Sequence, residues 1–341
     1  MKHRQRYPVT QNNYEYPTFG PEDDDFHDHV LSDRWWETET NWFSWCVPER
    51  KLSGWTYCQA RPNANICNGG AWVWDASSPF EWGLPYHANY NGLQLPPRNE
   101  RDMRDFEWPN GVHTKTLEPL KKYQIRYSDP GAFELDIVFD AIMPPNPHPT
   151  GVAPFYKGVH FDQAGRVTGS MILHGESIAI DCFAVRDRSW GPRPQGRPKK
   201  RKTTDHDQLS GTGGIGYSYG TLNEREAFLV YTVPTLDSDQ VVTGFLIRDG
   251  VYAHIIGGER KVVVDPEHGW VRTIDVEAHD DLGRTIKAHG EAQSWFFKGN
   301  PGDCQMWWWW DGVERAVGED QSYVSKRVRE KWISDARAAR G

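Results

Sequence analysis

The run from Arg186 to Arg193 (RDRSWGPR) concentrates more reactive side chains than any other stretch of the sequence. It follows a strand-like segment and places a carboxylate, arginines and an indole within eight residues. An aspartate beside arginines stays ionised and forms a rigid polar cluster. Such a cluster around Asp187 could orient a substrate or relay a proton. It could equally be a structural ion pair that closes the corner of a barrel, and the residues leave both interpretations open.

Motifs for metals and cofactors are weak. Gly211–Gly216 matches G-x-G-x-x-G, but its surroundings lack the strand and helix that a dinucleotide site needs. His27-Asp28-His29 has no third ligand nearby, and neither H-E-x-x-H nor G-x-S-x-G occurs. The five cysteines form no C-x-x-C pair, which predicts free thiols. We therefore expect no metal and no cofactor.

Tryptophan is unusually frequent, with 17 among 341 residues. Its large apolar face and single donor suit the walls of pockets and interfaces. In a strand, the rings of Trp307–Trp310 would alternate between two faces. One pair would then pack into the domain and the other against a neighbour or a ligand. Trp42 and Trp72 could line a cavity, with core packing as the other interpretation.

Strands are expected to position these residues. Apolar side chains recur at every second position over 133–141, 167–173 and 178–184, which predicts half-buried strands. We expect a turn at 162–165, a hairpin at Asp249-Gly250 and a helix over 322–339. Short strands joined by tight turns are typical of an antiparallel barrel or sandwich.

Length and charge narrow the function classes. The 39 Lys and Arg against 47 Asp and Glu give a net charge of −8, which argues against nucleic-acid binding. No run of about 18 apolar residues occurs, so we expect no membrane span and a cytoplasmic location. We expect an N-terminal arm over 1–32, β domains over 33–193 and 213–321, a basic linker over 194–212 and a helical end over 322–341.

Several segments resemble one known family. These are Gly165–Gly169 (GRVTG), His174–Glu176 (HGE), the run Arg186–Arg193 and the early Glu39–Phe43 (ETNWF). Together they resemble the lipocalin-like superfamily of carotenoid 1,2-hydratases, kievitone hydratase and fungal Diels–Alderases, including its bacterial members. The likeness spans about residues 35–325, and the D-x-x-W-G motif carries most of it.

The resemblance implies an all-β fold of two lipocalin-like antiparallel β-barrel domains, with an apolar pocket near their junction. It implies cofactor-free chemistry on isoprenoid, polyketide or prenylated aromatic molecules. The hydratases carry a His where this chain has Arg188, and a Tyr-x-Asp that Tyr217 and Tyr219 do not continue. These differences argue against carotenoid hydration.

We therefore expect a hydratase or dehydratase, isomerase or cyclase for a lipophilic terpenoid, steroid or polyketide-like substrate. Alkene hydration needs an acid near the double bond and aromatic faces that stabilise a cation. The alternatives are a non-catalytic carrier of hydrophobic molecules and an interaction protein, and a homodimer is compatible with each. The expected catalytic residues are Asp187, Arg193 and Glu176, with Asp181 as a further acid. The expected substrate-binding residues are Trp190, Arg188, Trp42, Trp72, Tyr217 and Tyr219.

Overall fold

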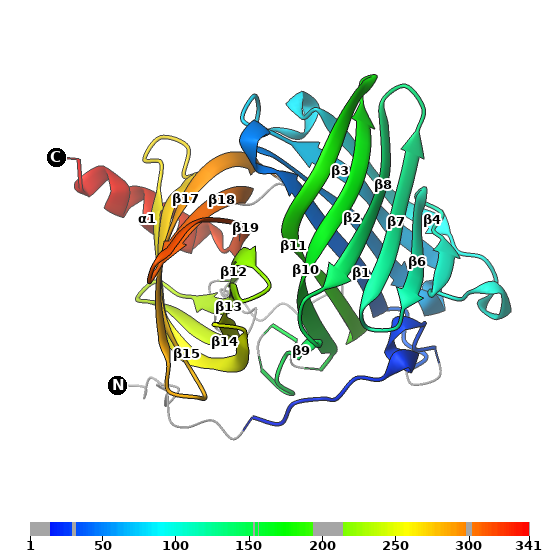
Figure 1. Ribbon diagram of the computed structural model, residues 1–341, viewed down its shortest axis with the longest axis horizontal. Helices are drawn as coiled ribbons and strands as arrows, with labels where there is room; N and C mark the ends of the chain where they lie inside the picture. The colour runs from blue at the N-terminus through cyan, green and yellow to red at the C-terminus, as the bar shows by residue number, and fades with distance from the viewer. Residues whose placement is uncertain are drawn as a thin grey trace, which may run out of the picture.

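Two antiparallel β-sheets lie side by side in the computed structural model (Figure 1). The structure describes residues 14–28, 32–152, 154–155, 157–193, 214–297 and 302–340. The expected linker over 194–212 and the basic run within it lie outside these residues, as does His29.

The first sheet has 11 strands and runs from β4 to β5 without closing, so it is a half-barrel. Its strand order is β4-β3-β2-β1-β11-β10-β8-β7-β6-β5, and the short β9 pairs with β10. The strands are β1 Glu37–Val47, β2 Leu52–Arg61, β3 Ile66–Trp74, β4 Tyr86–Gln94, β5 Asp105–Glu107, β6 Val112–Glu118, β7 Lys122–Asp129, β8 Phe133–Ala141, β9 Asn146–Pro147, β10 Val159–Leu173 and β11 Glu176–Pro192.

The second sheet is a closed barrel of consecutive antiparallel strands from β12 to β19. These strands are β12 Gly214–Asn223, β13 Glu226–Pro234, β14 Asp239–Arg248, β15 Val251–Val264, β16 Val271–Asp280, β17 Thr285–Phe296, β18 Asp303–Trp310 and β19 Val313–Val324. The α-helix α1, Lys326–Ala338, packs against β15. Short 3-10 helices are η1 Pro21–Asp24, η2 Pro48–Arg50, η3 Pro62–Ala64, η4 Glu81–Gly83 and η5 Arg98–Glu100.

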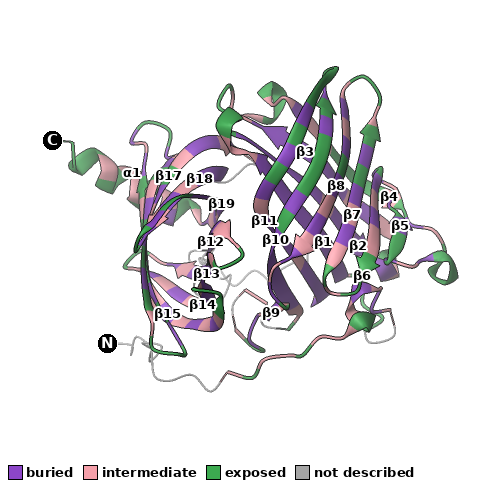
Figure 2. Cartoon of the chain, viewed as in Figure 1, coloured by how far each residue is buried: buried purple, intermediate pink, exposed green. Residues whose placement is uncertain are grey.

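Burial alternates along outer strands such as β8 and β16, whereas β1 and β13, which lie between the two domains, are buried on both faces (Figure 2). One apolar cluster fills the half-barrel and a second fills the closed barrel. A third, aromatic cluster contains residues of both sheets and forms the core between them. Its large members are Trp42, Trp55, Trp72, Trp74, Tyr217, Tyr219, Tyr231, Phe245 and Phe296. We call the face of the first sheet that contributes to this cluster the interdomain face.

The predicted all-β fold with a short C-terminal helix is confirmed. Of the two expected barrels, the second closes and the first remains a half-barrel. The strands expected over 133–141, 167–173 and 178–184 lie in β8, β10 and β11, and Asp249-Gly250 joins β14 to β15.

The predicted turn at 162–165 is wrong. These residues lie inside β10 and pair with 184–187 of β11. Gly165 serves close packing instead of a turn, because a Cβ there would lie 2.4 Å from the ring of Phe139. The helix begins later than expected: Ser325 caps it by accepting a hydrogen bond from the Val328 amide, and Ser322–Val324 end β19.

The tryptophan run alternates as predicted. Trp308 and Trp310 are buried in the closed barrel, whereas Trp307 and Trp309 are partly exposed on its outside. The cations of Lys51 and Arg315 lie over the Trp307 ring.

All five cysteines are buried and free, as expected. No helix in the described part of the chain has both the length and the apolar character that a membrane span requires.

Candidate active site

Two neighbouring strands bring three ionisable side chains together on the interdomain face. Asp162 of β10 is directly opposite Asp187 of β11 in the strand register, and His160 lies two residues before Asp162. Because side chains alternate along a strand, His160 and Asp162 point the same way. Trp42 of β1 is paired with Asp187 from the other side. The three ionisable groups each offer a ligand atom, all within 4.8 Å of one another.

The closed barrel completes this cluster with two tyrosines. The Tyr217 hydroxyl of β12 donates to Asp162 Oδ1 at 3.0 Å, and the Tyr231 hydroxyl of β13 lies 3.3 Å from the same oxygen. The Tyr231 oxygen is also 2.6 Å from His160 Nε2, which in turn is 3.1 Å from Asp162 Oδ1. The site is therefore assembled from both domains.

Three polar atoms of the cluster are buried without a hydrogen-bond partner among the described residues. They are His160 Nδ1, Asp162 Oδ2 and Asp187 Oδ1. Buried polar atoms in proteins are nearly always paired, so unpaired ones at one place mark a site of strain or chemistry. We call Asp162 and Asp187 the acid pair.

Burial sets the protonation of the cluster. It raises the pKa of Asp162 to about 8, although hydrogen bonds from Tyr217 and Tyr231 oppose the shift. Burial also raises the pKa of Asp187 to about 6, although the positive charges of Arg193 and Arg188 oppose the shift. Burial lowers the pKa of His160 to about 4. At neutral pH, Asp162 therefore holds a proton, Asp187 is ionised and His160 is neutral.

This arrangement pairs a proton donor with a proton acceptor in an apolar, aromatic setting. Two carboxyl groups whose pKa values are pushed apart by their surroundings are a recurring basis of acid–base catalysis. The same three side chains are also the one group among the described residues that could hold a metal ion. The Arg193 guanidinium, whose charge lowers the pKa of Asp187, would repel a cation there.

The comparisons with known proteins identify the family. A family model described as a domain of unknown function, DUF7064, matches residues 20–302. The chain belongs to the DUF7064 family. No curated protein matches it.

Three solved structures are similar to this DUF7064 member. A protein assigned as AttH from Nitrosomonas europaea matches with a TM-score of 0.58 and 12% identity, over 92% of this chain and 99% of the other. Kievitone hydratase from Nectria haematococca matches with a TM-score of 0.47 and 11% identity, over 84% and 89%. CghA with Sch210972 matches with a TM-score of 0.49 and 11% identity, over 83% and 86%. The structure from Nitrosomonas europaea, with a TM-score above 0.5, shares the overall fold of this chain.

Several residues that the sequence singled out lie at or beside the acid pair. Asp187, Tyr217 and Trp42 meet there. Arg193 bonds Ser189, whose position on β11 is two residues from Asp187. Tyr219 lies two residues after Tyr217 in β12, and its hydroxyl is 2.9 Å from the Ser44 hydroxyl.

The same aromatic core contains Trp72, which is fully buried. It contacts the other rings of the interdomain face.

Other predicted residues lie elsewhere. Arg188 and Trp190 point to the opposite face of β11, where the Trp190 ring stacks on His27 at 3.8 Å. Glu176 is exposed at the end of β11 and pairs with Arg50. Asp181 is exposed and pairs with Arg166. The structure does not bring these four to the acid pair.

Sequence reasoning missed His160, Asp162 and Tyr231. The signal for the first two is the spacing His-x-Asp, which places both side chains on one face when the segment is a strand. Because 162–165 was predicted as a turn, the side-chain alternation of a strand was not applied to this segment. Tyr231 lies in a segment correctly predicted as a strand, but its approach to His160 depends on how the two sheets pack.

Proposed function

We propose that this protein is an acid–base enzyme that adds or removes water, isomerises or cyclises a lipophilic substrate without a cofactor. The observation that carries this proposal is the acid pair: two buried carboxyl groups with unpaired oxygens, one protonated and one ionised at neutral pH. A protonated carboxylic acid in an apolar site is a strong candidate proton donor.

Hydration of an alkene illustrates the proposed chemistry. Asp162 donates its proton to one alkene carbon, and the adjacent carbon becomes cationic. The aromatic faces of Trp42 and Tyr217 stabilise that cation. Water attacks the cation, and Asp187 accepts the proton that the water loses. A proton then passes from Asp187 to Asp162, which restores both groups, and the net reaction adds one water to one double bond.

The surroundings of the acid pair support the proposed substrate class. Tryptophan, tyrosine and phenylalanine dominate the interdomain cluster, and they favour flat or branched apolar molecules. A terpenoid, steroid or polyketide-like alkene or alcohol would meet apolar ring faces if it entered this core. A cytoplasmic location and a homodimer remain predictions.

The experiment is a screen for turnover. Purified protein is incubated with a panel of lipophilic alkenes and tertiary or allylic alcohols in ¹⁸O-labelled water. Mass spectrometry follows the gain of labelled oxygen on hydration and the loss of water on dehydration, and chromatography follows isomers and cyclic products. The variants D162N and D187N should each lower turnover at least about 100-fold, whereas E176Q, at an exposed carboxylate, is the matched control and should keep it. Turnover that survives in D187N would refute the role of the acid pair.

A carrier of hydrophobic molecules is the second candidate, favoured by the size of the aromatic core between the domains. Native mass spectrometry of the purified protein would detect a bound lipophilic molecule. A carrier releases that molecule chemically unchanged after long incubation, and D187N would bind it as the wild type does.

A further inference from the structure

The strand that carries Asp187 holds two buried arginines on its other face. Arg186 and Arg188 flank Asp187 in β11, and both side chains are only 1% exposed. Side-chain alternation directs them into the half-barrel, away from the second domain. Two buried cations therefore lie directly behind the acid pair.

Residues of the same sheet provide some of the hydrogen-bond and ion-pair partners of these two arginines. The Arg186 Nε donates to Gln163 Oε1 at 2.8 Å, and its guanidinium lies 3.9 Å from the centre of the Tyr123 ring. Arg188 donates to the Thr40 carbonyl at 3.0 Å and lies 3.4 Å from a carboxylate oxygen of Glu39. Glu39 is therefore the one carboxylate that the sheet contributes to the described ion pairs of these two arginines.

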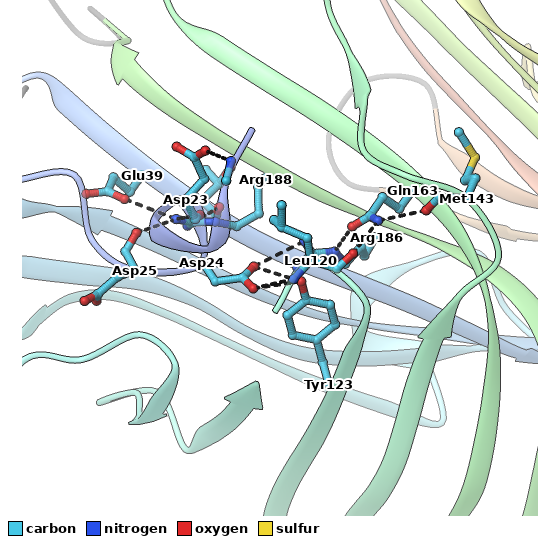
Figure 3. Close-up of polar contacts among 12 residues, drawn as sticks. Asp23, Asp24, Asp25, Glu39, Leu120, Tyr123, Met143, Gln163, Arg186 and Arg188 are labelled. Carbon is cyan, nitrogen blue, oxygen red and sulfur yellow. Dashed lines mark hydrogen bonds and ion pairs between the residues drawn. The ribbon is translucent and has the colours of Figure 1, made fainter. Parts of the chain in front are cut away.

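The second carboxylate comes from outside the sheet. Asp24 of η1 is 4% exposed, and its Oδ1 lies 3.5 Å from Arg186 Nη2. Asp24 also accepts hydrogen bonds from the Tyr123 hydroxyl at 2.8 Å and from the Leu120 amide at 2.7 Å. The Asp25 carbonyl of the same segment accepts from Arg188 at 3.0 Å. Figure 3 shows η1 set among these groups.

The segment Tyr14–Asp28 also reaches the second domain. Its Tyr16 ring stacks on His254 of β15 at 4.3 Å, and its Phe19 ring packs on Phe161 of β10 at 4.6 Å. The segment runs along both sheets (Figure 1). It therefore contacts both domains that form the acid pair's surroundings.

We propose that the N-terminal segment Tyr14–Asp28 is a working part of the active site, in which Asp24 acts as a positioning residue. Asp24 balances the charge of the two arginines behind Asp187 and fixes β11 against η1. This inference rests on the proposed function for its catalytic meaning, but its electrostatic part concerns the protein alone.

Loss of the Asp24 charge leaves two arginines opposite one carboxylate. The excess positive charge acts through the thin sheet on Asp187 and favours its ionised form. The groups that already face or flank Asp187 are unchanged by this substitution. They are His160 and Asp162 from β10, Tyr57 from β2, Tyr217 and Tyr231 from the closed barrel, and Arg186, Arg188 and Arg193. The pKa of Asp187 should therefore fall when Asp24 is replaced by Asn.

The test measures that pKa directly, by NMR of ¹³C-labelled aspartate carboxyl groups, and no substrate is needed. In D24N the pKa of Asp187 should fall by about half a unit to one unit. D25N is the matched control: it removes a charge from the same segment, but the Asp25 carboxylate is partly exposed and pairs with Arg104 at the surface. Its pKa effect on Asp187 should be much smaller.

A charge-balanced double variant separates electrostatics from damage to the fold. D24N/R186Q removes one negative and one positive charge, so the pKa of Asp187 should return towards the wild-type value. Should D24N not fold, D24N/R186Q is compared with R186Q alone, and loss of the Asp24 charge should again lower the pKa of Asp187. A D24N protein with an unchanged Asp187 pKa would overturn the proposal, as would a double variant that shifts as far as the single one.

Turnover distinguishes this inference from the proposed function. If both hold, the acidic limb of the pH–rate profile in D24N moves down by the same amount as the pKa. If the pKa shifts but D187N keeps full turnover, the proposed function fails and the positioning role of Asp24 stands.

Discussion

The raised pKa of Asp162 has a consequence for stability that can be measured without a substrate. A carboxyl group whose pKa rises on folding binds its proton more tightly in the folded state. The folded state then loses stability as pH rises from the ordinary pKa of 3.8 to the folded value of about 8. The slope is about 1.4 kcal/mol per pH unit. The variant D162N replaces the carboxyl group with an uncharged amide, so its stability should not fall with rising pH for this reason. The amide oxygen can still accept the hydrogen bond from the Tyr217 hydroxyl.

The size of the effect follows from the two pKa values. At pH 5 the wild type lies about 1.2 units above the unfolded pKa, which corresponds to about 1.6 kcal/mol. At pH 7 it lies about 3.2 units above, which corresponds to about 4.4 kcal/mol. The free energy of unfolding of D162N relative to wild type should therefore rise by about 2.8 kcal/mol between these two pH values.

Urea unfolding, followed by tryptophan fluorescence at several pH values, measures this difference. The control is D181N, because Asp181 lies on the same domain but is exposed, and pairing with Arg166 lowers its pKa. D181N should show no such widening from pH 5 to pH 7. If the free energy of unfolding of D162N relative to wild type does not change over this pH range, Asp162 is not buried in its protonated form.

Three further predictions concern catalysis and packing. The specificity constant kcat/KM should peak near pH 7. The proposed mechanism needs Asp187 ionised, with a pKa of about 6, and Asp162 protonated, with a pKa of about 8. A pH profile that does not fall on both sides of the peak contradicts this assignment. Chelators such as EDTA should leave turnover unchanged, and a loss that a divalent metal restores would replace the acid–base proposal with a metal site. W308A should lower the free energy of unfolding by about 3 to 5 kcal/mol in urea denaturation, because Trp308 is fully buried and packs closely on Gly290. W309A, at a partly exposed ring on the other side of the same strand, should cost far less, and equal losses would contradict the observed alternation.

Local patterns predict much of this fold. Alternation at every second position identified β8 and the parts of β10 and β11 that have only one face in a core, because hydrophobic burial enforces that period. The same rule predicted that the Trp307–Trp310 rings would divide between two faces. Closure of a sheet is not a local property, and nothing in the strands of the first sheet indicated that it stays a half-barrel.

The candidate site was predicted only in part, for a physical reason. Asp187 stood out because it lies in a dense polar run, but that run continues as a strand, which sends Arg188 and Trp190 to the opposite face. The role of Asp162 was missed because Asp-Gln-Ala-Gly has turn-forming composition. Pairing with β11 on one side, and with β9 and β8 on the other, holds this segment extended. The approach of Tyr231 to His160 depends on contacts between the sheets, which no local pattern contains.

The position of the acid pair at the seam between two domains ties its reactivity to the intact molecule. Neither domain alone surrounds Asp162, since one supplies the carboxyl group and the other supplies the tyrosines that cover it. Water entering an opened seam would return that carboxyl group to its ordinary acidity and leave it ionised at neutral pH. On the proposed mechanism, Asp162 would therefore serve as a proton donor only after the two domains have packed against each other.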